Sequence, residues 1–534
     1  MTKSPVRTAT TAVGLVAAAA IALSGCAAAQ PDEASTDIII GYGDVDTLDP
    51  AQFKTDTATL VVSNIYGTLF TQKYADHDGV LVGTDEYEPS LAESVEYSAD
   101  GTELTITVKP DLKFADGSDL TADDVAYTLQ RSLSDVGYTG IFADYLRFSD
   151  PADGIIATDD LTVTVQTEGE SPLLEKFLSF QTFGILSKAD AEANSTEEWA
   201  TDYFSEGGVS SGPYQVSDRT PGTNIVLEKN PEYTVADLSD SPETVTIQNQ
   251  PSAEQAYLAL QNGSIDIALG ASPDLAAEAE SVDSVKVITT ASGWINYLGM
   301  NAQVPALQDV RVRQAIDLLV PYQALRDEVM AGYAGPAYGA DPYPMNGALD
   351  ETGDKQAYDT DPDAAAQLLA DAGVSDLNLT LTVQASDPIA VKSATFIQSA
   401  LKDGGITVAV DQLADAEYFS ALGDGTTELF INSWYSWGED PVYQLNFLLR
   451  TGQFTNYARY SNAAVDSLLD QAMVEADETA RFDLGKQAQQ LVIDDAPWAF
   501  LFARNNLSLT SPEVGGVTRP DDTFLRLQYL TLQQ

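Results

Sequence analysis

The stretch "ATFIQSALKDGGITVAVDQL", residues 394–413, holds a predicted helix and a predicted strand in direct succession. Gly404 and Gly405 end the helix, because glycine readily adopts the backbone conformations that close a last helical turn. The segment "ITVAVDQL" that follows is rich in branched residues and is typical of a strand. A helix followed at once by a strand is the order found in βαβ units, so this stretch predicts an α/β fold.

The same two kinds of segment alternate along the rest of the chain. Residues 253–269 read as a helix, a glycine stop and a strand, and residues 309–330 as an amphipathic helix interrupted at Pro321. Residues 364–373 read as a helix that ends at a glycine. Further strands are predicted at residues 37–43, 103–109, 161–167 and 224–230. Because 534 residues exceed what one core usually supports, we predict an α/β protein of several lobes.

The composition is strongly acidic. The chain holds 81 Asp and Glu against 26 Lys and Arg, a formal net charge of −55. Such a surface repels phosphate backbones, so we expect no nucleic-acid partner. An acidic substrate is also disfavoured, unless a local cationic pocket overrides the field of the whole chain.

The N-terminus has the features of a targeting signal. Lys3 and Arg7 precede an uncharged stretch, residues 8–25, which ends in small residues. The tetrad "LSGC" resembles a bacterial lipobox, in which the cysteine is lipidated and becomes the first residue of the mature protein. This resemblance implies a signal peptide at residues 1–25, a lipid on Cys26 and a flexible tether at residues 26–36. An uncleaved membrane-spanning helix is the alternative.

Few catalytic or metal-binding constellations are compatible with the composition. Cys26 is the only cysteine and His77 the only histidine, and His77 stands beside a predicted Asp78-Gly79 turn. Zinc sites built on several histidines are therefore excluded, and we expect no metal and no cofactor. Residues 41–50 fail the calcium-loop template at its fifth and sixth places. A carboxylate pair for acid-dependent hydrolysis stays open among the 81 acidic residues, because spacing alone does not identify one.

A set of short motifs in a fixed order resembles one protein family. The chain is similar to the extracytoplasmic solute-binding proteins of ABC importers, specifically the large dipeptide, oligopeptide and nickel class. Each motif is weak alone, and the order of the whole set carries the resemblance. The motifs include "TLDP" (Thr47–Pro50), "IYGTLF" (Ile65–Phe70), residues 88–132, "GGVSSGPYQV" (Gly207–Val216), "YLALQNGSIDIAL" (Tyr257–Leu269), "YLGMN" (residues 297–301) and "DDAPWAFLF" (residues 494–502).

The resemblance implies a periplasmic-binding-protein-like fold with two lobes, a hinge and an extra inserted domain. Lobe I is expected to be discontinuous, at residues 37–70, 200–291 and 500–534. The inserted domain II is expected at residues 71–199 and lobe III at residues 292–499. The ligand would be enclosed between lobes I and III by hinge closure.

The resemblance also implies ligand-contacting residues after "TLDP". In this segment we single out Thr55, Asp56 and Thr57, where Asp56 is suited to meet a cationic group. The alternative is a polar loop that caps the helix beginning near Thr57, because Ser, Thr and Asp cap helices routinely.

A second candidate segment is "INSWYSWGEDPVYQL", residues 431–445. It resembles a family pattern that reads roughly W-x-x-D-x-x-D-P, with Asp440 at the second aspartate. Trp434, Tyr435 and Trp437 are expected to form an aromatic wall, with core or hinge packing as the alternative. Trp294 and Asn296, just before "YLGMN", complete the expected wall.

One position departs from that pattern. Trp437 stands where peptide binders of the family have the aspartate that pairs with the ligand's α-ammonium. A buried ammonium without a carboxylate is costly, so peptides with free amines require a substitute among Asp56, Glu439 and Asp440. Trp437 is otherwise suited to stack on a sugar, a modified peptide or a cation.

Together these observations predict a binding protein and not an enzyme. We expect a monomer that is lipid-anchored at the extracytoplasmic face of the cell membrane and binds a peptide or a similarly sized polar solute. It would deliver this solute to ABC permease and ATPase subunits. The alternatives are a non-peptide ligand such as an oligosaccharide or a sugar-phosphate or opine-like compound, a ligand sensor, and an anchored hydrolase that uses carboxylates.

Overall fold

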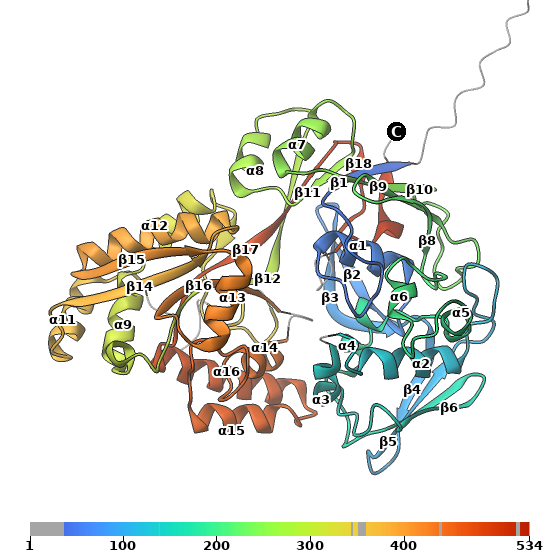
Figure 1. Cartoon of the computed structure of the whole chain (residues 1–534), viewed down its shortest axis with the longest axis horizontal. Coiled ribbons are helices and arrows are strands. Elements are labelled where there is room, and N and C mark those ends of the chain that lie inside the picture. The colour runs from blue at the N-terminus through green and yellow to red at the C-terminus, as the bar shows by residue number, and fades with distance from the viewer. Residues whose placement is uncertain are drawn as a thin grey trace, which may run out of the picture. The chain divides into compact units, whose positions relative to one another are not determined.

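The computed structural model describes residues 37–532, apart from residues 138, 343–344, 351–358, 437–439 and 520–523. The described residues form one compact unit of mixed α/β structure with several sheets (Figure 1). The α/β class predicted from residues 394–413 is therefore confirmed.

The largest sheet has eleven strands within the described residues. In spatial order its main path is β15 (Ile406–Leu413), β14 (Leu377–Gln384), β16 (Leu429–Tyr435), β12 (Lys286–Met300), β17 (Trp498–Thr510), β11 (Ile267–Leu269), β1 (Ile38–Tyr42), β10 (Thr244–Asn249), β9 (Asn224–Lys229) and β8 (Tyr214–Thr220), with β13 (Ala334–Gly335) beside β17.

The stretch that predicts the fold class forms a βαβ unit at one end of this sheet. Strands β14 and β15 pair in parallel, and helix α12 (Pro388–Asp403) connects them. Asp387 caps the helix, because its Oδ1 accepts hydrogen bonds from the backbone N–H groups of Ile389 (2.9 Å) and Ala390 (3.0 Å). After the helix, Gly405 has a φ of 87°, which favours glycine over other residues.

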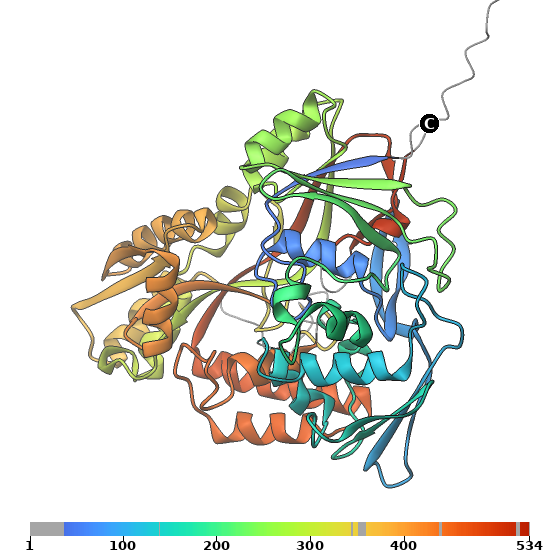
Figure 2. The same cartoon turned by 45° about the vertical axis from the view of Figure 1, so that its right-hand side comes forward.

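Two long strands, β12 and β17, occupy the middle of the sheet and run antiparallel to each other (Figures 1 and 2). On one side of this pair lie β16, β14 and β15, and on the other side lie β11, β1 and the strands that follow. The β12–β17 pairing shifts register between Thr290 and Trp294 and again between Asn296 and Tyr297, where the ladder is irregular. The pair joins two groups of strands that are far apart in sequence.

Smaller sheets flank the large one. A four-stranded sheet of order β4-β5-β7-β6 comes from residues 92–166, and a three-stranded sheet has the order β19-β3-β2. The strands of these sheets are β4 (Ala92–Tyr97), β5 (Glu103–Val108), β7 (Thr162–Gln166), β6 (Ile155–Asp159), β19 (Val517–Arg519), β3 (Val80–Pro89) and β2 (Phe70–His77). A further pair is β18 (Val514–Gly515) with β20 (Thr531–Leu532).

The turn predicted at Asp78-Gly79 is present. Asp78 and Gly79 join β2 to β3 with φ angles of 55° and 85°, as a two-residue hairpin turn requires. His77 ends β2 beside this turn, where the sequence places it. At the start of helix α2 (Ala122–Ser132), Asp124 Oδ2 accepts a hydrogen bond of 2.9 Å from the backbone N–H of Thr121.

The helices cover the sheets and separate several hydrophobic cores, as expected for a chain of this length. Helices α15 and α16 lie side by side in both views (Figures 1 and 2). The α-helices are α1 (Asp56–Ile65), α2 (Ala122–Ser132), α3 (Phe142–Leu146), α4 (Leu174–Phe177), α5 (Lys188–Asn194), α6 (Thr201–Phe204), α7 (Ala253–Gln261), α8 (Pro273–Ala279), α9 (Val310–Leu319), α10 (Tyr322–Ala324), α11 (Pro362–Asp371), α12, α13 (Asp415–Asp424), α14 (Pro441–Leu448), α15 (Ala463–Ala472) and α16 (Glu478–Asp495).

Candidate functional site

A cavity of about 960 Å³ lies against the middle of the large sheet. Its walls come from β12, β16 and β17, from helix α1 with the loop before it, and from the first residues of α8 and α12. Cavities of this size enclose most of the surface of a peptide-sized or drug-sized ligand. The cavity is therefore the candidate binding site.

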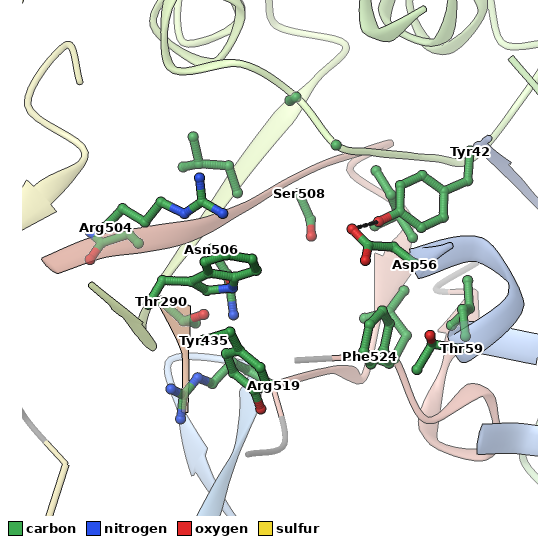
Figure 3. A pocket seen from close by; sticks show the side chains of 18 of the residues that line it. Tyr42, Asp56, Thr59, Thr290, Tyr435, Arg504, Asn506, Ser508, Arg519 and Phe524 are labelled. Carbon is green, nitrogen blue, oxygen red and sulfur yellow. Dashed lines mark hydrogen bonds between the residues drawn. The ribbon is translucent and has the colours of Figure 1, made fainter. Parts of the chain in front are cut away.

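One wall is a row of three side chains that lie directly opposite one another on neighbouring strands. Arg504 of β17 pairs with Trp294 of β12, and Trp294 pairs with Tyr435 of β16. Opposed residues of antiparallel strands project to the same face, so the three side chains are neighbours. The ring centroids of Trp294 and Tyr435 lie 5.6 Å apart. Figure 3 shows Arg504 and Tyr435 in this wall.

The guanidinium of Arg504 is held against the Trp294 ring. Its Cζ lies 3.9 Å from the ring centroid, a cation–π contact. The backbone is fixed at the same point, because Ser292 Oγ donates a 2.5 Å hydrogen bond to the carbonyl of Arg504. Among the described residues, no side chain forms a hydrogen bond or an ion pair with this guanidinium.

The surroundings of Arg504 are poor in water. This loss of hydration lowers the pKa of Arg504 from its ordinary value, while the charges of Asp387 and Asp56 oppose the shift. An arginine keeps its proton under these conditions. The cavity therefore holds a fixed cation that has two carboxylates in its field but none in contact.

The opposite wall carries a carboxylate. Asp56, the first residue of α1, accepts a 3.2 Å hydrogen bond from the hydroxyl of Tyr42 (Figure 3). Solvent in the cavity reaches this side chain, but the protein around it displaces enough bulk water to raise the pKa of Asp56. The Tyr42 hydrogen bond and the charge of Arg504 act in the opposite direction.

Several polar atoms that line the cavity lack partners in the described part of the chain. These are both amide atoms of Gln181, Nδ2 of Asn506 and Nε1 of Trp434. Gln181 is only 2% exposed, so its amide has little water to compensate. A buried polar group without a hydrogen bond costs free energy, and a polar ligand is one means of satisfying it.

The charge of the cavity is opposite to that of the chain. Among the described residues that line it, Lys54, Arg504 and Arg519 are cationic and Asp56 is the only carboxylate. The whole chain has a formal net charge of −55. This is the local cationic pocket that an anionic ligand would require in so acidic a protein.

Two features that other functions require are absent from the described residues. No cluster of three or more His, Cys, Asp or Glu side chains in this part of the chain is arranged to hold a metal ion. No described helix combines the length and the apolar character needed to cross a bilayer.

Sequence comparison identifies the family. Residues 86–456 match the bacterial extracellular solute-binding proteins, family 5, over the middle part of that family. This match spans more than half of the chain. The chain belongs to the family 5 solute-binding proteins. Members of this family bind solutes outside the cytoplasm and are not enzymes, so the predicted family and the prediction of a binding protein are confirmed.

Curated relatives of this family 5 protein include several binding proteins. The probable D,D-dipeptide-binding periplasmic protein DdpA of Escherichia coli is 28% identical over 485 residues, which cover 90% of this chain and 90% of that protein. The glutathione-binding protein GsiB of Pectobacterium atrosepticum is 27% identical over 513 residues, which cover 93% of this chain and 94% of that protein.

Solved structures show the same fold. The substrate-binding protein CtaP of Listeria monocytogenes, an ABC transporter component, has a TM-score of 0.80 at 24% identity and covers 94% of this chain and 100% of its own. DppA of Helicobacter pylori, solved with the peptide STSA, has a TM-score of 0.76 at 22% identity, with 93% and 98% covered. The chain therefore has the multi-domain periplasmic-binding fold of family 5.

The structure brings together part of the residue set predicted from the sequence. Trp437 lies outside the described residues, as do Glu439 and Cys26. Thr57, Asn296 and Asp440 are absent from the cavity lining. The predicted residues that line the cavity are Thr55, Asp56, Trp294, Trp434 and Tyr435.

Asp440 has a partner within the chain. Arg481 donates to both oxygens of this carboxylate, at 2.6 and 2.7 Å, and Asp440 Oδ1 also accepts a 2.8 Å hydrogen bond from the backbone N–H of Tyr443 as the cap of α14. Burial by itself raises the pKa of Asp440, but Arg481, with smaller contributions from Lys176 and the backbone N–H of Tyr443, holds the pKa below its ordinary value. This geometry gives Asp440 a structural role and leaves no free oxygen pair for a ligand.

The other two residues outside the lining are buried in the fold. Thr57 is 3% exposed on α1, and Asn296 is 1% exposed on β12, with both amide atoms unpartnered among the described residues. Thr55 lines the cavity and also caps α1, because its Oγ1 accepts a 3.2 Å hydrogen bond from the backbone N–H of Ala58. The capping role that the sequence left open for this loop is therefore present.

Arg504 is the cavity residue that the sequence reasoning missed. It follows the apolar run "APWAFLFA" at residues 496–503, and it is one of only 26 basic residues in the chain. A scarce cation directly after an apolar run is a usable signal for a functional position. Its face and its aromatic partner depend on the register with β12, which the sequence does not show.

Proposed function

We propose that this family 5 protein is a lipid-anchored receptor that captures a peptide or a similarly sized polar solute and hands it to an ABC permease and its ATPase. The observation that carries the proposal is the cavity of about 960 Å³ with polar side chains that lack partners among the described residues. A solute with amide and charged groups would satisfy them.

The amine of such a solute would be received by Asp56. Three carboxylates were candidates to replace the missing aspartate at Trp437. Asp440 is bonded on both oxygens by Arg481, and Glu439 lies outside the described residues. Asp56 lines the cavity and keeps one oxygen free of hydrogen bonds from described residues, which supports this assignment.

The membrane attachment rests on the sequence. "LSGC" at residues 23–26 has the form of a lipobox, and the charge-free stretch before it has the form of a signal. Cys26 would carry the lipid, and residues 26–36 would be the tether. The protein would then act at the extracytoplasmic face of the membrane, as a monomer.

The test is to identify what the protein binds. The full chain, purified from membranes in detergent, is denatured, and the released small molecules are identified by mass spectrometry. Rebinding of each candidate is then measured as a shift of the thermal unfolding midpoint. Peptides that are released and rebind would support the proposal. A sugar or a sugar-phosphate in their place would contradict a peptide ligand, and a chain that releases and rebinds no small molecule would contradict the receptor function.

The lipid is tested on the same preparation. The mass of the N-terminal fragment is expected to correspond to a lipidated Cys26, and a Cys26→Ser variant is expected to lose this mass and the membrane fraction. An unlipidated fragment that still contains residues 1–25 would contradict the anchor and support the uncleaved helix.

A further inference from the structure

The described lining contains three cations and one carboxylate, and an aromatic ring packs against one of these cations. Arg504 lies on β17 directly opposite Trp294 of β12, and the Trp294 ring covers one face of its guanidinium at 3.9 Å. The edge of the guanidinium, where its N–H donors lie, has no partner among the described residues. Arginine presents these donors as a planar fork that fits the two oxygens of one carboxylate.

We infer that the solute carries a carboxylate, which accepts hydrogen bonds from Arg504 while Trp294 covers the face of the guanidinium. The inference rests on the proposed function and narrows it to solutes with this group. Arg504 is then a determinant of specificity, and the solute supplies the second half of a buried ion pair.

Neighbouring groups on β17 extend the same subsite. Asn506 and Ser508 follow Arg504 at intervals of two residues along β17, the spacing of side chains on one face of a strand, and both line the cavity. Nδ2 of Asn506 is buried without a partner in the described chain, so it is a further donor for a ligand oxygen. The donors along this edge suit a carboxylate followed by a peptide carbonyl.

The charges of the cavity suit a solute that carries both signs. Lys54, Arg504 and Arg519 attract its anionic group, while Asp56 and Asp387 act on Arg504 electrostatically without touching it. In Figure 3, Asp56 lies across the cavity from Arg504, so a solute with an amine and a carboxylate at different ends meets an opposite charge at each.

The experiment compares one peptide pool with and without its carboxylates. Random tetrapeptides with free termini are offered to the immobilised full chain, and so is the same pool after methyl esterification, which removes every carboxylate and leaves the amines. Retained peptides are quantified by mass spectrometry. The variants are Arg504→Gln, Arg504→Lys and, as a matched control, Arg326→Gln, whose guanidinium bonds to Gln323 outside the cavity lining.

We expect the native chain to retain the free-acid pool about tenfold or more over the ester pool, the effect of a hydrogen-bonded charge pair. Arg504→Gln is expected to lower retention of the free-acid pool to that of the esters. Arg504→Lys is expected to fall between, because lysine keeps the charge but lacks the planar fork. Arg326→Gln is expected to match the native chain.

Equal retention of both pools by the native chain would overturn the inference and leave the proposed function standing. An Arg504→Gln chain that still prefers the free acids as the native chain does would also overturn it. Retention of neither pool would overturn the proposed function for peptides, and this inference with it. If Arg504→Gln fails to fold, the Arg504→Lys chain decides, because a preference for the free acids equal to that of the native chain would overturn the role given to the planar fork.

Discussion

Arginines in the core and in the cavity of this protein differ in one respect. Arg131 stacks over Phe204 at 5.1 Å and donates to both oxygens of Asp49, at 2.8 and 2.5 Å. Arg504 stacks over Trp294 at 3.9 Å and has no carboxylate in contact among the described residues. The fold therefore completes the first ion pair and leaves the second incomplete, as a binding site for a charged solute requires.

The difference has an energetic consequence. Breaking a buried ion pair leaves an uncompensated charge in a medium of low polarity, so the completed pairs contribute to the stability of the fold. Arg504, whose countercharge a ligand would supply, contributes to binding and adds little to the stability of the empty protein. Substitutions at the two kinds of site are expected to separate these effects.

The largest effect is expected at a completed pair. Asp440→Asn leaves the guanidinium of Arg481 buried without its countercharge, and the side chains of this pair are only 4% and 3% exposed. We expect a loss of about 3–5 kcal/mol in the free energy of unfolding, measured by urea titration. Asp283→Asn, at an exposed position, is the control. A loss under about 1 kcal/mol would contradict the structural role given to Asp440.

Asp317 is a buried carboxyl that forms no ion pair among the described residues, so it extends the comparison of paired and unpaired charges. Asp317 accepts a hydrogen bond from Tyr322, and burial raises the pKa of Asp317 from 3.8 to about 8. The folded state therefore keeps a proton that the unfolded state releases above pH 4, so stability falls as the pH rises toward 8.

We expect the native chain to lose about 1–3 kcal/mol of unfolding free energy between pH 5 and pH 8 through this group. Asp317→Asn is expected to remove that part of the slope, because asparagine carries no ionisable proton and still accepts from Tyr322. Urea titrations of both chains at several pH values measure it. Parallel pH profiles would show that Asp317 is ionised in the folded state.

The cavity carboxylate is expected to affect binding and not stability. Asp56→Asn should weaken the binding of a peptide with a free amine by about tenfold, the cost of a lost charged hydrogen bond. Because the pKa of Asp56 is raised, binding to the native chain should already weaken at a pH above the ordinary value of 3.8.

Calorimetric titration from pH 7 downward tests both points, with the N-acetylated peptide as the matched ligand. Asp56→Asn should bind the acetylated and the free peptide equally. If the native chain also binds the two peptides equally, the solute's amine does not meet Asp56.

The smallest effect is expected at the ring that supports Arg504. Trp294→Leu removes the cation–π contact, which contributes about 1 kcal/mol, or roughly a fivefold change in affinity for a free-acid peptide. Trp294→Phe keeps an aromatic face and should lose less. An unchanged affinity in Trp294→Leu would mean that the pairing register of β12 and β17 positions the Arg504 guanidinium without help from the ring.

The sequence by itself determined the local elements and the family. Gly404 and Gly405 separate a helix from a strand, and this signal does not depend on tertiary contacts. The order of motifs such as "TLDP" indicates family 5. It also placed Asp56 in the cavity set, because the resemblance implies ligand contacts after "TLDP", and it placed Trp294 there as part of an expected aromatic wall. The sequence also shows that basic residues are scarce. From this it follows that an anionic ligand requires a local cationic pocket.

Only the tertiary structure decided which charges are free. Asp440 and Asp56 are both aspartates in candidate segments, but Arg481 comes from a helix 41 residues away and occupies Asp440 alone. Arg504 meets Trp294 across a strand pairing that joins residues far apart in the chain. Pairing of charges depends on side chains within a few ångströms, and sequence order does not encode such distances when the partners come from different elements.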